Sequence, residues 1–216
     1  MLAGIYITMI IISFLTSLTA YFQKDAKRYL RLFPILLFAT IIVELGARWL
    51  QVHKSSRLAP YILYNSFACI EFLFYMYAVR EIIRSVRLKK IIFFAACIFL
   101  LLGIFNILFI QKTTSFNSIT YAIGCLLIAV SCFYYFFELF QQSYSVTLVR
   151  QPAFWICAGL LFYYTCSFPI YGLLNFLSSK PIMKNIQVII ILLNVFLYSS
   201  FTIAFLCRVR VRNSTS

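Results

Sequence analysis

The chain has 216 residues, of which 63% are hydrophobic and 11% are charged, and its formal net charge is +14. A soluble domain of this size could not hold that balance without exposing large apolar patches to water, so the composition excludes a soluble enzyme or a soluble nucleic-acid-binding domain. We therefore expect the lipid bilayer to be the solvent of the whole chain, 1–216. At about 20 residues for each span, the length leaves room for about six to eight transmembrane helices.

Apolar runs bounded by charged or turn residues predict the elements in chain order. Each run is long enough to span a bilayer, and the runs lie at about 2–22, 32–52, 60–82, 91–111, 118–140, 153–177 and 186–207. The clearest break is the charged stretch 80–90, which we expect to be a loop between the third and fourth helices. The expected fold class is all-α, a polytopic bundle of seven transmembrane helices in a single domain.

Basic residues predict the orientation of this bundle. The first run has no basic residue before it and Lys24 after it, which is unlike a cleavable signal peptide and places the N-terminus outside. The side that would then be cytoplasmic, with the C-terminus, holds Lys24, Lys27, Arg28, Arg31, Arg80, Arg84, Arg87, Lys89, Lys90, Arg150, Arg208, Arg210 and Arg212. The opposite side holds Lys54, Arg57, Lys112, Lys180 and Lys184. This excess indicates a multi-pass protein of the inner (plasma) membrane, with anionic lipids as possible partners at its cytoplasmic face and no need for nucleic acid.

Three ionisable residues fall at bilayer depth, where a charge costs about 2.5–3.5 kcal/mol. They are Glu44 and Arg48 in the second run and Glu71 in the third. Glu44 and Arg48 are four residues apart, so we expect them to pair on one helix face. Glu71 is then the unmatched acid, and a proton or ligand site explains it better than packing does.

Polar residues recur at helical spacing and predict that each helix turns one polar stripe toward the bundle interior. With the three ionisable residues, the candidate ligand or proton site includes Tyr64, Tyr75, Tyr164, Asn194 and Tyr198. The alternative is that these groups only hydrogen-bond neighbouring helices, at about 0.6 kcal/mol each. Glu138 lies near a helix end, where we expect a solvated charge, and Pro169 is a candidate hinge because proline removes a backbone hydrogen bond.

Several classes of site are absent from the sequence. The run 186–207 has no lysine for a retinal Schiff base, and the single histidine, His53, is predicted to lie in an outer loop, which argues against a zinc hydrolase. We expect no catalytic residues, metal or cofactor. The seven cysteines all fall in apolar runs and form no C-x-x-C pair, so we interpret them as small packing residues.

Three segments carry a resemblance to a known family. They are Leu63-Tyr64-Asn65, the stretch 154–163 (FWICAGLLFY) and the stretch 201–208 (FTIAFLCR), with Glu44 and Glu71 between charged loops. In these features the chain resembles a family of uncharacterised multi-span, seven-helix inner-membrane proteins of the Bacteroidota. The resemblance implies a bacterial inner-membrane location and no assigned activity.

Two functions and a third alternative remain open from the sequence. The first is a minimal seven-helix sensor or receptor-like module, with a polar midplane pocket that signals to a separate cytoplasmic protein. The second is a small-solute or proton-coupled transporter that uses Glu71 as proton carrier. The third is a membrane assembly or scaffold subunit. A receptor predicts a pocket open on one side, a transporter a cavity reachable from both sides, and a scaffold no cavity.

Overall fold

The computed structural model describes the backbone of residues 2–22, 26–53, 59–110, 116–141, 148–173 and 180–213. Within these ranges the chain is helical, with short connections and no strand. The helices are α1 (Leu2–Ser17), α2 (Arg28–Val52), α3 (Ala59–Ile82), α4 (Val86–Phe105), α5 (Ser118–Phe140), α6 (Pro152–Gly172) and α7 (Lys180–Asn213). A 3-10 turn (Leu18–Ala20) extends α1, a π-helical turn (Asn106–Ile110) extends α4, and a 3-10 turn (Leu148–Arg150) precedes α6.

The all-helical prediction is confirmed, and the range expected for the fifth helix matches α5. The loop predicted at 80–90 is wrong in extent, because only Ile83–Ser85 separate α3 from α4. The Ser85 side chain accepts a hydrogen bond from the Leu88 backbone N–H at 3.5 Å and so caps the start of α4. Lysine and arginine are good helix formers, so their charge marks the membrane boundary without ending the helix.

Other helix ends also differ from the predicted ranges. α2 begins at Arg28 instead of 32, and α7 runs from Lys180 to Asn213, beyond the predicted 186–207 at both ends. Hydropathy marks the part of a helix that lies in hydrocarbon, whereas the helix continues into the polar boundary as long as its backbone hydrogen bonds do. α6 ends at Gly172, and 174–179, which include the predicted end at 177, lie outside the described residues, as does 111.

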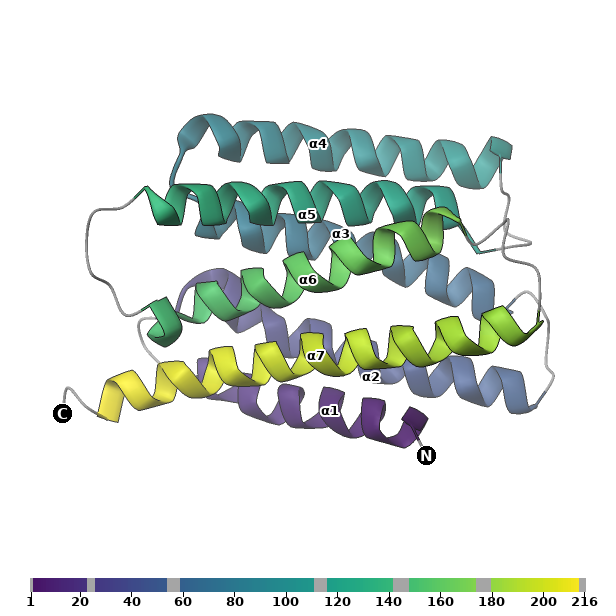
Figure 1. Ribbon diagram of the computed structural model, residues 1–216, viewed down its shortest axis with the longest axis horizontal. Coiled ribbons are helices and arrows are strands. Elements are labelled where there is room, and N and C mark those ends of the chain that lie inside the picture. The colour runs from purple at the N-terminus through teal and green to yellow at the C-terminus, as the bar shows by residue number, and fades with distance from the viewer. Residues whose placement is uncertain are drawn as a thin grey trace.

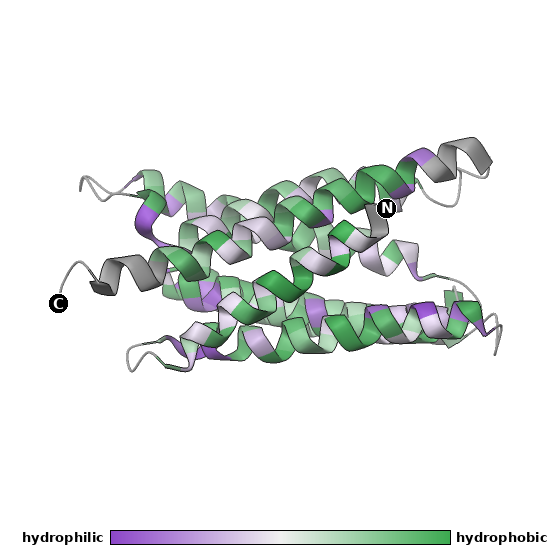
Figure 2. Cartoon of the chain, turned by 90° about the horizontal axis from the view of Figure 1, so that it is seen from below, coloured by the Kyte–Doolittle hydropathy of each residue, from purple (hydrophilic) through white to green (hydrophobic). Residues whose placement is uncertain are grey.

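The composition of these helices is that of an integral membrane protein. Six are long and apolar enough to cross a membrane, namely α2 to α6 and the Asn185–Cys207 part of α7. The apolar part of α1, Gly4–Ala20, is shorter. Figure 2 shows hydrophobic residues along the length of the helices and many of the hydrophilic ones near the two ends of the bundle.

Successive helices run in opposite directions (Figure 1). The last helix, α7, packs beside the first, α1. Packing between neighbours gives a closed ring in the order α1, α2, α3, α5, α6, α7, with α4 outside it against α3 and α5. α1 begins, α2 ends and α6 ends at one end of the bundle, which we call the N-terminal end. α2 begins, α3 ends and α7 ends at the opposite end, which we call the basic end.

An aromatic cluster packs inside the ring around Phe33, which lies five positions after the start of α2. The Phe33 ring packs edge-on against Phe74, Phe201 and Phe205, at centroid distances of 5.0, 5.2 and 5.7 Å. Phe33 is fully buried, and Tyr75 joins the cluster from α3 at 6.3 Å. This packing joins α2, α3 and α7 inside the ring.

Candidate ligand-binding cavity

A cavity of about 360 Å³ lies inside the ring. Its helical lining residues lie between the N-terminal end and the middle of the bundle, and every ring helix contributes at least one. The lining consists of Tyr6, Thr40, Val43, Glu44, Tyr61, Tyr64, Phe67, Ala68, Glu71, Phe116, Tyr121, Tyr163, Tyr171, Ile186, Gln187, Ile190, Ile191, Asn194 and Tyr198. Two of these side chains, Tyr61 and Gln187, are exposed, and both lie in the part of their helix nearer the N-terminal end.

Glu44 is held in the cavity wall by tyrosines from two other helices. Its carboxylate accepts a hydrogen bond from the Tyr6 hydroxyl at 2.9 Å and a longer one from the Tyr64 hydroxyl at 3.4 Å. Arg48 lies one turn further along α2, and its charge acts on the Glu44 carboxylate, but it is not among the described lining residues. Tyrosine hydroxyls from α1 and α3 therefore orient Glu44 toward the other lining groups.

Glu71 reaches the cavity from deeper in the bundle. It follows Ala59, the first residue of α3, by twelve positions, which places it about 18 Å along a helix that rises about 1.5 Å per residue. The Tyr75 hydroxyl acts on the Glu71 carboxyl from the next turn of α3, but among the described residues it has no partner in hydrogen-bond geometry. Glu44 also acts on Glu71 electrostatically, so the two acids share one site.

The predicted site residues fall into two groups. Glu44, Tyr64, Glu71, Asn194 and Tyr198 come together around the cavity, as the polar stripes indicated. Tyr75 and Tyr164 do not line it. Both are fully buried, their rings are 6.0 Å apart, and together with Phe72 and Phe201 they form an aromatic floor.

Several lining tyrosines were not among the predicted site residues. Tyr121 and Tyr163 join α5 to α6, with their hydroxyl oxygens 3.4 Å apart, and Tyr121 also packs on Tyr171 at 4.1 Å between ring centroids. Tyr6 and Tyr198 rings lie 5.9 Å apart across α1 and α7. The sequence signal that could have identified these residues is the tyrosine hydroxyl, because a hydroxyl in an apolar span needs a hydrogen-bond partner. Tyr6 has few polar neighbours in its own run, so its partner is expected on another helix.

Pro169 lies in the last turn of α6, two residues before Tyr171, which lines the cavity. A bend at Pro169 would therefore move the wall near the opening, whereas the basic end lies at the far end of α6. The prediction that Pro169 is a hinge stays a prediction.

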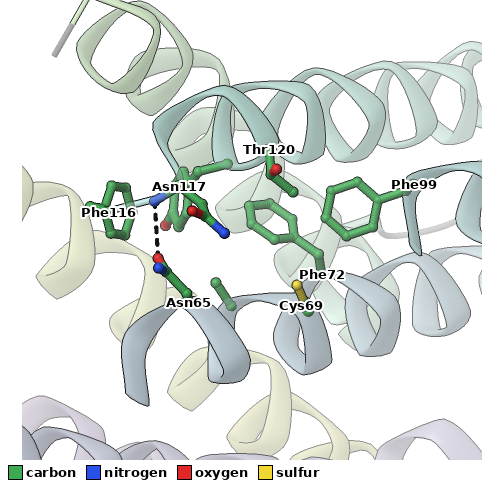
Figure 3. A pocket seen from close by; sticks show the side chains of 9 residues that line it. Asn65, Cys69, Phe72, Phe99, Phe116, Asn117 and Thr120 are labelled. Atoms are coloured by element: carbon green, nitrogen blue, oxygen red, sulfur yellow. Dashed lines mark hydrogen bonds between the residues drawn. The ribbon is translucent and has the colours of Figure 1, made fainter. Parts of the chain in front are cut away.

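A second, much smaller pocket adjoins the cavity between α3, α4 and the start of α5 (Figure 3). Its volume is about 10 Å³, about the size that holds one water molecule. The Asn65 side-chain oxygen accepts a hydrogen bond from the Asn117 backbone N–H at 3.0 Å, which ties the residues before α5 to α3. Asn106, the first residue of the π-helical turn, donates to the Thr120 hydroxyl at 2.7 Å. These contacts support the cavity wall from behind.

No family model matches the chain, and comparisons with curated proteins and with solved structures found no match either. The site must therefore be interpreted from its own geometry. The resemblance to a family of the Bacteroidota stays a prediction.

Proposed function

We propose that the chain is a receptor-like or sensor membrane protein that binds a small molecule in this cavity. The supporting observation is that the exposed lining side chains, Tyr61 and Gln187, lie toward the N-terminal end, whereas the buried rings of Tyr75 and Tyr164 form a floor at the inner end of the cavity. Its volume is at the lower end of the range for small-molecule sites, about 300–1,000 Å³. A pocket reached from one side suits a sensor better than a transporter.

The proposed topology has seven spans, with the cavity facing the outside of an inner membrane. The sixteen residues of α1 and its three-residue extension add to about 30 Å, the thickness of the hydrocarbon core. α1 packs along α2 and α7 as part of the ring, which favours a spanning helix. The basic end would then face the cytoplasm, where anionic lipids and a signalling protein are the proposed partners.

A proton-coupled transporter is the second candidate, and one observation favours it. Glu44 and Glu71 line the same cavity, and a pair of interacting carboxyls can exchange a proton for a solute. This function requires the aromatic floor to open toward the basic end. A scaffold role gains no support from a cavity of this size.

Cysteine accessibility separates the two functions. We would introduce Asn194→Cys, deep in the cavity, and Val149→Cys, an exposed position at the basic end, and map the label to each site by mass spectrometry. A sensor with the proposed topology predicts that a membrane-impermeant thiol reagent modifies the Asn194→Cys variant only from outside and the Val149→Cys variant only from inside. Modification of the Asn194→Cys variant from both sides would favour the transporter, and modification from neither side would contradict both functions.

A further inference from the structure

The cavity gathers acidic side chains in a strongly basic chain. Lysine and arginine number 19 in the sequence, against five aspartates and glutamates. Two of those five acids, Glu44 and Glu71, line the cavity, while the described lining residues include no lysine, arginine or histidine. The lining thus places two carboxyl groups, each able to balance a bound cation, in a protein that is otherwise strongly basic.

The rest of the lining is aromatic to an unusual degree. Seven tyrosines line the cavity: Tyr6, Tyr61, Tyr64, Tyr121, Tyr163, Tyr171 and Tyr198. The face of a tyrosine ring attracts a cation within about 6 Å, and the attraction rises when water is excluded. A cage of aromatic rings with a carboxylate is the arrangement that recognises ammonium groups, because the rings accept the methyl or methylene surface while the acid balances the charge.

A carboxylate at bilayer depth costs free energy unless a cation balances it, and Arg48 acts on the Glu44 side of the cavity. A neutral ligand would leave that cost in place, and an anion would increase it. A bare metal ion is poorly matched, because the described residues hold no group of three or more metal-ligating side chains of the His, Cys, Asp and Glu types. An organic cation balances the charge and fills the apolar volume at once.

We propose that the ligand is a small organic cation, an ammonium group carried on an apolar body, bound between Glu44 and Glu71. This inference rests on the proposed function and names its ligand class. Tyr6 and Tyr64 fix the Glu44 carboxylate in the wall, while Glu71 supplies the deeper negative charge. The tyrosine rings of the cavity surround the ammonium group.

The test compares choline and benzyltrimethylammonium with 3,3-dimethylbutan-1-ol, which replaces the choline nitrogen with an uncharged carbon. Binding to the purified full chain in lipid nanodiscs would be followed by calorimetry. We expect both cations to bind and the neutral isostere to bind at least about tenfold more weakly. Equal binding of choline and its isostere, or binding by neither cation, would overturn the inference.

Variants of Glu44 and Glu71 test whether these two acids bind the cation. Glu71→Gln and Glu44→Gln preserve side-chain volume, and each should weaken cation binding at least about tenfold. Glu81→Gln, which removes an acid at the basic end, is the matched control and should bind as the unaltered chain does. Two glutamine variants that both keep full affinity would overturn the inference even if cations bind.

These outcomes are distinguishable from failure of the proposed function. If uncharged compounds bind in the cavity as tightly as the cations, and the Asn194→Cys variant is modified only from outside, the sensor remains and only the ligand class is wrong. If the cations bind but the Asn194→Cys variant is modified from both sides, the ligand class stands and the sensor is replaced by a transporter.

Discussion

Glu138 should be one of the most important polar residues for stability at the basic end. Its two carboxylate oxygens accept hydrogen bonds from consecutive backbone N–H groups, from Ser85 at 3.0 Å and from Arg84 at 2.9 Å. These amides belong to the three-residue connection Ile83–Ser85, where α4 begins. The carboxylate therefore ties α5 to the start of α4 and lies where a helix N-terminus favours negative charge.

The expected loss of stability in Glu138 variants can be calculated from these two hydrogen bonds. Hydrogen bonds to charged groups contribute about 1.5–3 kcal/mol each, and the lower value applies because Arg84 is exposed to competing solvent. We expect Glu138→Ala to lower the free energy of unfolding by about 2–3 kcal/mol, because both acceptors are lost. Glu138→Gln keeps one acceptor and should lower it by about 1–1.5 kcal/mol.

Reversible unfolding in mixed bicelles, titrated with a denaturing detergent, measures this free energy. Glu81→Gln is the control, since Glu81 pairs with Arg80 at 3.1 Å and both side chains are about a third exposed, at 37% and 36%. An exposed pair of this kind contributes about 0–1 kcal/mol. If Glu138→Ala cost no more than Glu81→Gln, the two backbone hydrogen bonds would carry no net stability and the reasoning would be refuted.

Three other predictions test packing, the cavity and topology. Gly124→Ala should destabilise the fold by about 1–3 kcal/mol, because the added Cβ would lie 2.7 Å from the buried Phe72 ring. Gly46→Ala is the control and should not destabilise it, because the nearest contact of its Cβ is at 3.7 Å. Thermal unfolding of the two variants compares their stabilities. Tyr6→Phe should cost about 1–2 kcal/mol in the same assay by removing a hydrogen bond to the Glu44 carboxylate. Reporter fusions should place the N-terminus outside and the C-terminus inside, and a shared side would contradict seven spans.

Hydropathy predicted the helices because a lipid-exposed backbone must satisfy its own hydrogen bonds, which leaves few other structures for long apolar runs. Prediction from hydropathy was less accurate at the helix ends. The charged residues after Ser85 continue into α4, because a hydroxyl cap and not the loss of hydropathy sets the boundary. Glu138 lies near the end of α5 as predicted, but its partners are backbone amides that no side-chain pattern reveals.

The candidate site was predictable where one helix carried the evidence. Glu44 and Glu71 stand out from apolar neighbours, and helical spacing placed Tyr64 and Tyr198 on the interior face. The depth of the cavity was harder to predict. A polar stripe indicates which way a side chain points, but it does not indicate whether the opposite helix leaves space there. Tyr75 lies one turn below Glu71 on the same stripe, yet the aromatic cluster closes over it.

Tyrosine explains how one set of residues can serve both packing and binding. Its ring contributes apolar area to helix contacts, as Tyr121 does against Tyr171, while its hydroxyl can reach a polar partner. In the lining, those hydroxyls orient Glu44, so a charge that hydrocarbon would penalise becomes part of a built site. In the aromatic floor, the hydroxyls of Tyr75 and Tyr164 have no partner in hydrogen-bond geometry among the described residues. The Tyr6 and Tyr64 hydroxyls thus bind a carboxylate beside the cavity, whereas the Tyr75 and Tyr164 hydroxyls are enclosed by packed rings, and this contrast is the physical reason to look for a ligand beside Glu44.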